Sequence, residues 1–231
     1  MTYPHPVRTH ASSETSMRQG RIRCAQEHGA NPSMEEYFDT LSTSWEANLE
    51  PCGTKHVVTA FLAGIKPGSR VLDVGCGTGI MTQAYLDASA AEVVGLDVAR
   101  GMIAIAQEKF AHDARVRFQC ANIYDYEDER PFDAFVAYNV YPHLMDKEKL
   151  ARKAAELLKA DGRFIVAHGV SRTAINAHHA CVPESVCTHL ESARESSRAW
   201  EGLFAIDQII DTDEYYCFGG MPKNNVAPAG R

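Results

Sequence analysis

The sequence predicts an α/β fold in which helices cover both faces of a mostly parallel sheet. From Lys66 to Ala167, short apolar runs alternate with amphipathic helical patterns, and this order implies right-handed crossovers between parallel strands. A glycine-rich turn directly follows the first apolar run, as at the ligand sites of open α/β sheets. Two further apolar runs, separated by a very short connection, close the pattern. They predict an antiparallel hairpin at the end of the domain.

The composition of the 231 residues is that of one well-filled globular domain, with 45% hydrophobic and 23% charged residues. A net charge of -7 disfavours nucleic acid as a partner, because affinity for phosphates comes mostly from Lys and Arg. No apolar run approaches the roughly 20 residues that span a bilayer, and residues 1–23 lack the apolar core of a secretory signal. The seven cysteines are irregularly spaced and form no C-x-x-C motif, so we expect reduced thiols. Together these observations predict a cytoplasmic protein without membrane contact.

Residues 1–53 are expected to form an N-terminal arm and a helical lid. Ser33 and Glu36 have the spacing of a capping box. Apolar side chains then recur at helical spacing: Met34, Tyr37 or Phe38, Leu41, Trp45 and Leu49. The aromatic stripe is typical of a core-facing helix, and it also suits a lid that folds over a cleft and excludes water. A second helix is predicted over residues 54–63.

Residues 54–220 are expected to form the main domain, and residues 221–231 a disordered tail. Pro67-Gly68 predicts a turn before the first strand, and Asp161-Gly162 predicts a turn before the fifth. A helix is predicted near residues 189–200, before the hairpin. The strands of the alternating region are predicted over residues 70–74, 92–96, 116–119, 132–138 and 163–167, and the hairpin strands over residues 204–210 and 214–218.

The turn after the first strand reads Asp73-Val-Gly75-Cys-Gly77-Thr-Gly79. Glycines permit sharp turns and the close approach of a ligand, and their alternate spacing favours a ligand over a purely geometric need. The spacing differs from the dinucleotide pattern G-x-G-x-x-G, and a carboxylate beside the turn attracts an ammonium or sulfonium group but repels a pyrophosphate. Asp97, at the end of the next strand, can accept hydrogen bonds from both hydroxyls of a ribose. One cationic adenosine ligand satisfies both acids.

The segments VLDVGCGTG, GLDVARGMIAIAQEKF and CANIYDY resemble the cofactor half of class I S-adenosylmethionine-dependent methyltransferases. The resemblance implies a seven-stranded Rossmann-like sheet with an antiparallel last strand, and S-adenosylmethionine as cofactor. It assigns cofactor contacts to Asp73, Gly75, Cys76, Gly77, Thr78, Gly79, Asp97, Val98, Met102, Asn122, Ile123 and Asn139. Asn122 stands where the family usually has Asp, and its amide oxygen can still accept from the adenine amino group. PHLMDKEK and HGVSRTAINAHH further resemble a subgroup of small bacterial and archaeal members.

Methyl transfer requires alignment of donor and nucleophile, and removal of a proton where the acceptor carries one. His143 and His168 follow the fourth and fifth strands and are the candidate catalytic bases, with loop or capping roles as the alternative. Substrate contacts are predicted for Tyr37, Trp45, Tyr141, Arg172 and His178, with Arg172 suited to an anionic group. A metal held by His168, His178 and His179 is an alternative without a defined acid or cysteine partner, so no metal is expected.

The sequence therefore predicts a methyltransferase that acts on a small molecule, with neither nucleic acid nor membrane as partner. A catalytically silent S-adenosylmethionine-binding regulatory or partner module has the same glycine turn and Asp97, and differs only near His143 and His168. A nucleotide-linked oxidoreductase is disfavoured by the G-x-G-x-G spacing. Oxygen, nitrogen, sulfur and carbon all stay open as the acceptor atom.

Overall fold

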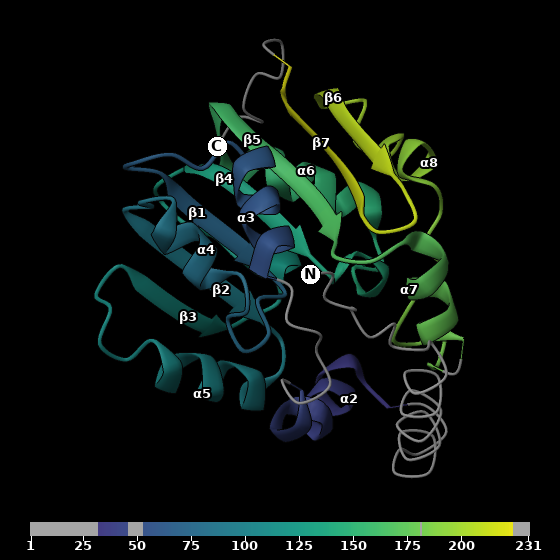
Figure 1. Ribbon diagram of the computed structural model, residues 1–231, viewed down its shortest axis with the longest axis horizontal. Coiled ribbons are helices and arrows are strands. Elements are labelled where there is room, and N and C mark those ends of the chain that lie inside the picture. Colours follow the sequence, from purple (N-terminus) through teal and green to yellow (C-terminus); the bar gives the residue numbers. More distant parts are fainter. Residues whose placement is uncertain (1–31, 46–52, 181, 224–231) are drawn as a thin grey trace, which may run out of the picture.

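The computed structural model describes residues 32–45, 53–180 and 182–223. Within these residues one sheet has the strand order β3-β2-β1-β4-β5-β7-β6 (Figure 1). β7 runs antiparallel to β5 and β6, and the other neighbouring pairs are parallel. This arrangement confirms the predicted fold class. The strands are β1 Arg70–Val74, β2 Glu92–Asp97, β3 Val116–Cys120, β4 Phe132–Tyr138, β5 Leu158–His168, β6 Phe204–Asp211 and β7 Tyr216–Pro222.

Helices cover both faces of the sheet because neighbouring side chains of the buried strands point to opposite sides. Val71 of β1 packs in a cluster with Ala60 of α3 and Tyr85 of α4. Leu72, the next residue, packs in a different cluster with Leu150 of α6. Among the described helices, none is long and apolar enough to cross a bilayer. The helices are α2 Met34–Leu41, η1 Ser42–Ser44, α3 Gly53–Leu62, α4 Thr82–Asp87, α5 Arg100–Lys109, η3 Ile123–Asp125, η4 Tyr141–His143, α6 Lys147–Leu157, α7 Arg172–His179 and α8 Ala193–Ser197.

The fifth strand is longer than predicted, because β5 begins at Leu158 and not after the Asp161-Gly162 pair. Leu158 is paired with Phe132 of β4, and the register shifts between Phe132 and Ala134. A Cβ atom on Gly162 would lie 3.0 Å from the Phe132 carbonyl oxygen. The glycine therefore accommodates a close approach of two strands, and the predicted turn at this position is wrong.

The terminal hairpin has a longer connection and a longer second strand than predicted. Residues 212–215 join β6 to β7, and Thr212 closes the turn by donating its N–H to the Tyr215 carbonyl oxygen at 3.0 Å. Met221 and Pro222, which the sequence assigned to the tail, pair in β7 with Ala205 and Phe204. The helix predicted over residues 189–200 is regular only in α8, from Ala193 to Ser197.

The predicted capping box starts the N-terminal helix α2. The Ser33 hydroxyl oxygen accepts from the Glu36 N–H at 3.2 Å, and Glu36 Oε2 accepts from the Ser33 N–H at 3.0 Å. Asp39, one turn further on, accepts from the Gly101 N–H at 2.7 Å and so joins α2 to α5. Figure 1 shows α2 beside α5, past the ends of β2 and β3. Leu49, the last residue of the predicted periodicity, lies outside the described residues.

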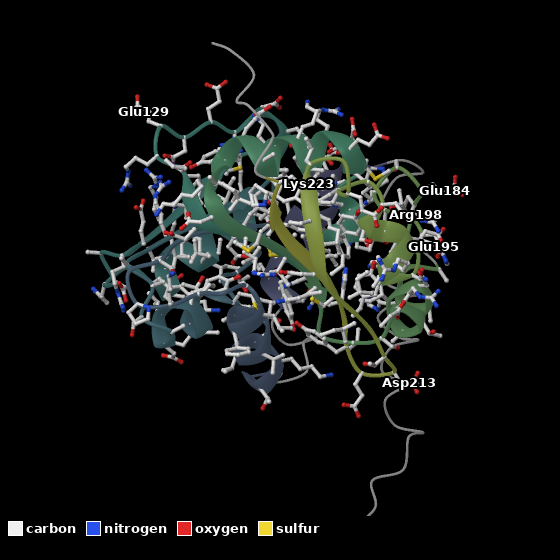
Figure 2. All side chains as sticks on the ribbon, turned by 90° about the horizontal axis from the view of Figure 1, so that it is seen from above. Glu129, Glu184, Glu195, Arg198, Asp213 and Lys223 are labelled. Atoms are coloured by element: carbon white, nitrogen blue, oxygen red, sulfur yellow. The ribbon has the colours of Figure 1, made fainter. Side chains whose placement is uncertain are left out.

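Figure 2 shows the sheet and its packed side chains from above, with charged side chains projecting from the rim. The labelled ones come from loops, from α8 and from the ends of the hairpin: Glu129, Glu184, Glu195, Arg198, Asp213 and Lys223. This distribution leaves the interior to apolar residues, with few buried ionisable groups, and each of those needs its own explanation.

Candidate active site

A cavity of about 240 Å³ lies where β1, β2 and β4 end and where α2 crosses them. The carboxyl ends of parallel strands are the usual ligand site of an open α/β sheet. Most of the predicted cofactor residues line this cavity: Gly75, Cys76, Gly77, Asp97, Val98, Met102, Asn122, Ile123 and Asn139. Asp73, Thr78 and Gly79 are not among the lining residues.

Asp97 presents a fixed carboxylate to the cavity. Its Oδ2 accepts from the Gly77 N–H and its Oδ1 accepts from the Ala99 N–H, both at 2.9 Å. Burial raises the pKa of Asp97, while these backbone donors act in the opposite direction. Each carboxylate oxygen has two lone pairs, so each keeps one for a ligand. The side chain is therefore an oriented pair of acceptors suited to two neighbouring hydroxyl groups.

Asp73 is buried beneath the turn, with 1% of its surface exposed. It lies in the middle of the sheet, between Gly95 of β2 and Val136 of β4. Its Oδ1 accepts from the Tyr85 hydroxyl at 3.3 Å, and its Oδ2 has no hydrogen-bond partner. Burial raises the pKa of Asp73 to about 7. Asp73 therefore lies next to the cavity lining without being part of it, and its contact with a cationic ligand stays a prediction.

The glycines of the turn have different reasons to lack a side chain. A Cβ atom on Gly75 would lie 2.3 Å from Val140 Cγ2, and one on Gly79 would lie 3.0 Å from Phe110 Cε2. At Gly77 the nearest atom would be Trp45 Nε1, at 3.7 Å. All three have positive φ. Close packing thus accounts for Gly75 and Gly79, whereas a Cβ atom on Gly77 would make only an ordinary contact with Trp45, so positive φ is what favours glycine there.

The α2 segment forms an aromatic wall of the cavity, but with a different residue from the one predicted. Trp45 lines the cavity together with Phe38, whereas Tyr37 is buried beside Phe38 and does not line it. The Phe38 ring centroid lies 5.9 Å from that of Trp45 and 4.9 Å from that of His143. Met34 and Glu35 complete this wall. The spacing of Met34, Phe38 and Trp45 on one helical face was the available signal for Phe38.

His143 lines the cavity beside Phe38, and its tautomer follows from its hydrogen bond. Nδ1 lies 2.8 Å from the Val186 carbonyl oxygen. A carbonyl only accepts, so Nδ1 carries the proton and Nε2 keeps a free lone pair. Burial lowers the pKa of His143 to about 4, which keeps the ring neutral at neutral pH.

Lys147, at the start of α6, holds the turn that carries His143. Its Nζ donates to the carbonyl oxygens of Tyr141 and Leu144, both at 2.5 Å. A cation at a helix N-terminus opposes the helix dipole, so these carbonyl contacts supply the compensating interaction. Tyr141, a predicted substrate contact, is 2% exposed and packs 5.3 Å from the Phe218 ring, outside the cavity lining.

His168, the second candidate base, is completely buried at the end of β5 and does not line the cavity. β7 runs beside it and pairs Tyr216 with it. Neither ring nitrogen has a hydrogen-bond partner, and burial lowers the pKa of His168 to about 3. The structure therefore does not bring His168 to the position that a base for the acceptor requires.

The predicted polar contacts on α7 also lie away from the cavity. Arg172 Nε is 3.4 Å from Asp211 Oδ2, at the end of β6, so its charge is already paired. His178 is exposed, and its ring centroid lies 5.6 Å from that of His179. His179 in turn lies 4.8 Å from His143. In the described parts of the chain, no three His, Cys, Asp or Glu side chains gather in a way that could hold a metal ion.

Replacing His168 with methionine is expected to make the fold more tolerant of acid. The pKa of His168 is about 3 in the folded state and about 6.5 in the unfolded state. Below about pH 6.5 the unfolded state therefore binds a proton that the folded state does not, and the free energy of unfolding falls. This loss amounts to about 2 kcal/mol at about pH 5. Urea unfolding at about pH 7 and pH 5 measures it. His112→Met, on the surface, is the control, and an equal pH dependence of wild type and His168→Met would contradict the prediction.

Residues 71–162 match the family described as "Methyltransferase domain". An uncharacterized methyltransferase of Schizosaccharomyces pombe is 27% identical over 175 residues, which cover 65% of this chain and 61% of that protein. A ubiquinone biosynthesis O-methyltransferase of Neisseria meningitidis is 33% identical over 99 residues, 41% of this chain and 42% of the relative. The matches thus span less than two thirds of these curated relatives.

The fold is also similar to that of solved methyltransferase structures. Phosphoethanolamine N-methyltransferase 2 of Haemonchus contortus, in complex with S-adenosyl-L-methionine, superposes with a TM-score of 0.63 at 22% identity. The alignment covers 76% of this chain and 45% of that one. The sheet order, the turn and strand end that shape the cavity, and the match over residues 71–162 lead to one conclusion: residues 71–162 are similar to the methyltransferase domain family, and the fold is that of class I S-adenosylmethionine-dependent methyltransferases.

Proposed function

We propose that this chain transfers a methyl group from S-adenosylmethionine to a small-molecule acceptor, with His143 as the group that receives the acceptor's proton. One observation carries the proposal. A single cavity is lined by the anchored carboxylate of Asp97 and by His143, whose Nε2 is unprotonated. A nucleoside and a proton-bearing acceptor can therefore bind next to each other.

The residues on the Asp97 side match the chemistry of an adenosine. The free lone pairs of the carboxylate suit the two ribose hydroxyls, and Val98, Met102 and Ile123 offer apolar surface to a flat base. The Asn122 amide oxygen accepts from the Tyr124 N–H at 3.1 Å and has a second lone pair for the base. When bound, S-adenosylmethionine would supply an activated methyl group, carried on a cationic sulfur, to the nucleophilic atom of the acceptor.

Asn139 completes the floor of the site in a conformation that few residues adopt. Its φ of 56° lies in the left-handed region, where asparagine is tolerated better than most residues. Its side-chain Oδ1 accepts from the Gly169 N–H at 3.0 Å, which ties the end of β4 to the loop after β5. This link fixes the position of the turn that follows, and with it His143.

Binding and turnover experiments separate this proposal from the alternatives. Calorimetry with S-adenosylhomocysteine is expected to give a saturable site, and NADH is expected not to compete for it. Release of S-adenosylhomocysteine is then followed across phenols, thiols, amines and quinols. Binding without release for any acceptor class would favour the silent regulatory module, and tight binding of NADH alone would overturn the family-based assignment of the cofactor.

Replacing His143 with glutamine is expected to lower kcat by about 100-fold, at the low end for loss of a general base. Glutamine can still donate to the Val186 carbonyl, but it offers no basic nitrogen. Because the pKa of His143 is about 4, wild-type kcat should be independent of His143 ionisation above about pH 5 and fall below it. Steady-state kinetics test this, with His112→Gln as control. Equal kcat values would exclude His143 as the base, provided that S-adenosylhomocysteine affinity is unchanged.

A further inference from the structure

We propose that the acceptor is an uncharged phenol, and that the site disfavours acceptors that carry a carboxylate or phosphate group. The inference rests on the proposed function, because it concerns the half of the same cavity that the nucleoside leaves open. It is carried by the charges that line this half, by its aromatic wall and by the tautomer of His143.

The lining of the cavity carries negative charge and no fixed positive charge among the described residues. Glu35, which is exposed, supplies a carboxylate on the open half and Asp97 one on the nucleoside half, and within the described ranges no Lys or Arg lines the cavity. The histidine at the acceptor side, His143, is neutral because its only N–H is committed to the Val186 carbonyl and burial disfavours a second proton. An anionic acceptor would therefore meet repulsion from the wall without a compensating ion pair.

Two cations of the elements that follow β4 and β5 are already engaged. Lys147 is directed under the η4 turn, where two carbonyl oxygens receive its hydrogens. Arg172, which the sequence suggested as an anion site, is paired with Asp211. Neither residue lines the cavity, so neither offers a charge to a carboxylate or phosphate bound there.

The wall formed by α2 and by Trp45, the residue after η1, favours a flat apolar body. The Phe38 and Trp45 rings meet edge to face at an interplanar angle of 77°, and the Phe38 ring meets His143 at 85°. Leu144 and Met145 also line the cavity, next to His143. Aromatic rings prefer such edge-to-face surroundings, so an arene can bind among Phe38, Trp45 and His143.

The proton chemistry of His143 favours a phenol over an aliphatic alcohol. The lone pair on Nε2 can accept the hydrogen bond of a hydroxyl group. Its low basicity, which comes from burial, requires an acceptor that releases a proton readily. A phenol, with a pKa of about 10 like that of tyrosine, meets this requirement better than an aliphatic alcohol does.

A binding experiment with saturating S-adenosylhomocysteine tests the inference without turnover. The probes are 4-methylcatechol and 3,4-dihydroxybenzoate. They differ only in that the first has a methyl group where the second has a carboxylate. Affinities are measured from the change in tryptophan fluorescence. We expect 4-methylcatechol to bind at least about tenfold more tightly than 3,4-dihydroxybenzoate, and a methylated product to form from 4-methylcatechol.

Charge reversal at the rim supplies the matched variant. Glu35→Lys should improve the binding of 3,4-dihydroxybenzoate by about tenfold and leave that of 4-methylcatechol within about twofold. Glu129→Lys makes the same charge change on an exposed loop outside the cavity and should alter neither affinity. Thermal unfolding of both variants checks that α2 remains folded.

The outcomes distinguish the inference from the proposed function. If S-adenosylhomocysteine does not bind, both are wrong. If it binds and 3,4-dihydroxybenzoate binds as tightly as 4-methylcatechol, or if 4-methylcatechol fails to bind, the inference alone is wrong. The inference alone is also wrong if Glu35→Lys leaves the discrimination between the catechol and the benzoate unchanged.

Discussion

Replacing Asp97 with asparagine is expected to weaken the binding of S-adenosylhomocysteine by about a thousandfold. Hydrogen bonds to a charged group contribute about 1.5–3 kcal/mol each, and two of them would be lost or weakened. The amide would also place an NH₂ group against the N–H of Gly77 or Ala99, both of which now donate to the carboxylate. Calorimetry measures the affinity, and circular dichroism checks that the fold is retained.

Asp73→Asn is the matched control. Like Asp97, Asp73 is an aspartate near the carboxyl end of a strand, but it is buried and does not line the cavity. We expect its effect on affinity to stay below about tenfold. The raised pKa of Asp73 also gives a stability test: its ionisation costs stability as the pH rises from about 4 through about 7, and asparagine removes this cost. The assignment of the nucleoside site to Asp97 would be wrong if Asp73→Asn weakened binding more than Asp97→Asn does.

Replacing Gly75 with alanine is expected to destabilise the protein by more than about 3 kcal/mol, through overpacking and backbone strain together. The new Cβ atom would lie 2.3 Å from Val140 Cγ2, at a φ of 67° that side chains disfavour. Val140 belongs to the segment between β4 and η4, so the displacement also moves the turn that carries His143. Urea unfolding with coincident fluorescence and circular dichroism transitions measures the loss.

Gly68→Ala separates the two causes. Gly68 has a φ of 87°, but a Cβ atom there has nothing within 4 Å. It should therefore show only the strain, about 1–2 kcal/mol. The double variant Gly75→Ala/Val140→Ala should recover part of the stability, because the Val140 methyl groups cause the shortest contact. Equal losses for Gly75→Ala and Gly68→Ala would show that packing against Val140 does not contribute.

The nucleoside side of the cavity could be predicted from the sequence because its determinants are local. A buried strand, a glycine turn and an acid at the end of the next strand place Gly77 and Asp97 at the same edge of the sheet. Asp73 differs for an equally local reason, since it is still part of β1 and its side chain lies on the face of the sheet that α4 covers, where Tyr85 donates to it. The exact end of a strand is the feature that sequence patterns define least well.

The acceptor side could not be predicted in the same way, because contacts distant in sequence decide it. Helical spacing permits either Tyr37 or Phe38 to face the cleft, and the docking of Asp39 on α5 selects Phe38. His143 and His168 both lie near the carboxyl end of a strand, but the pairing of β5 with β7 buries His168. Arg172 is engaged by Asp211, 39 positions later in the chain. None of these partners is visible in the motif itself.

The attachment of α2 has a consequence for how acceptor preference can change. The short helix α2 supplies Met34, Glu35 and Phe38 to the cavity. Two contacts hold it on α5: Asp39 accepts from the Gly101 N–H, and Ser42 packs so closely on Gly101 that a Cβ atom there would lie 2.5 Å from the Ser42 hydroxyl oxygen. The strand ends that face the nucleoside are separate from it. The cover is thus an exchangeable part: grafting a different helix that keeps these two anchors would give a chimera with a new acceptor range and an unaltered donor half.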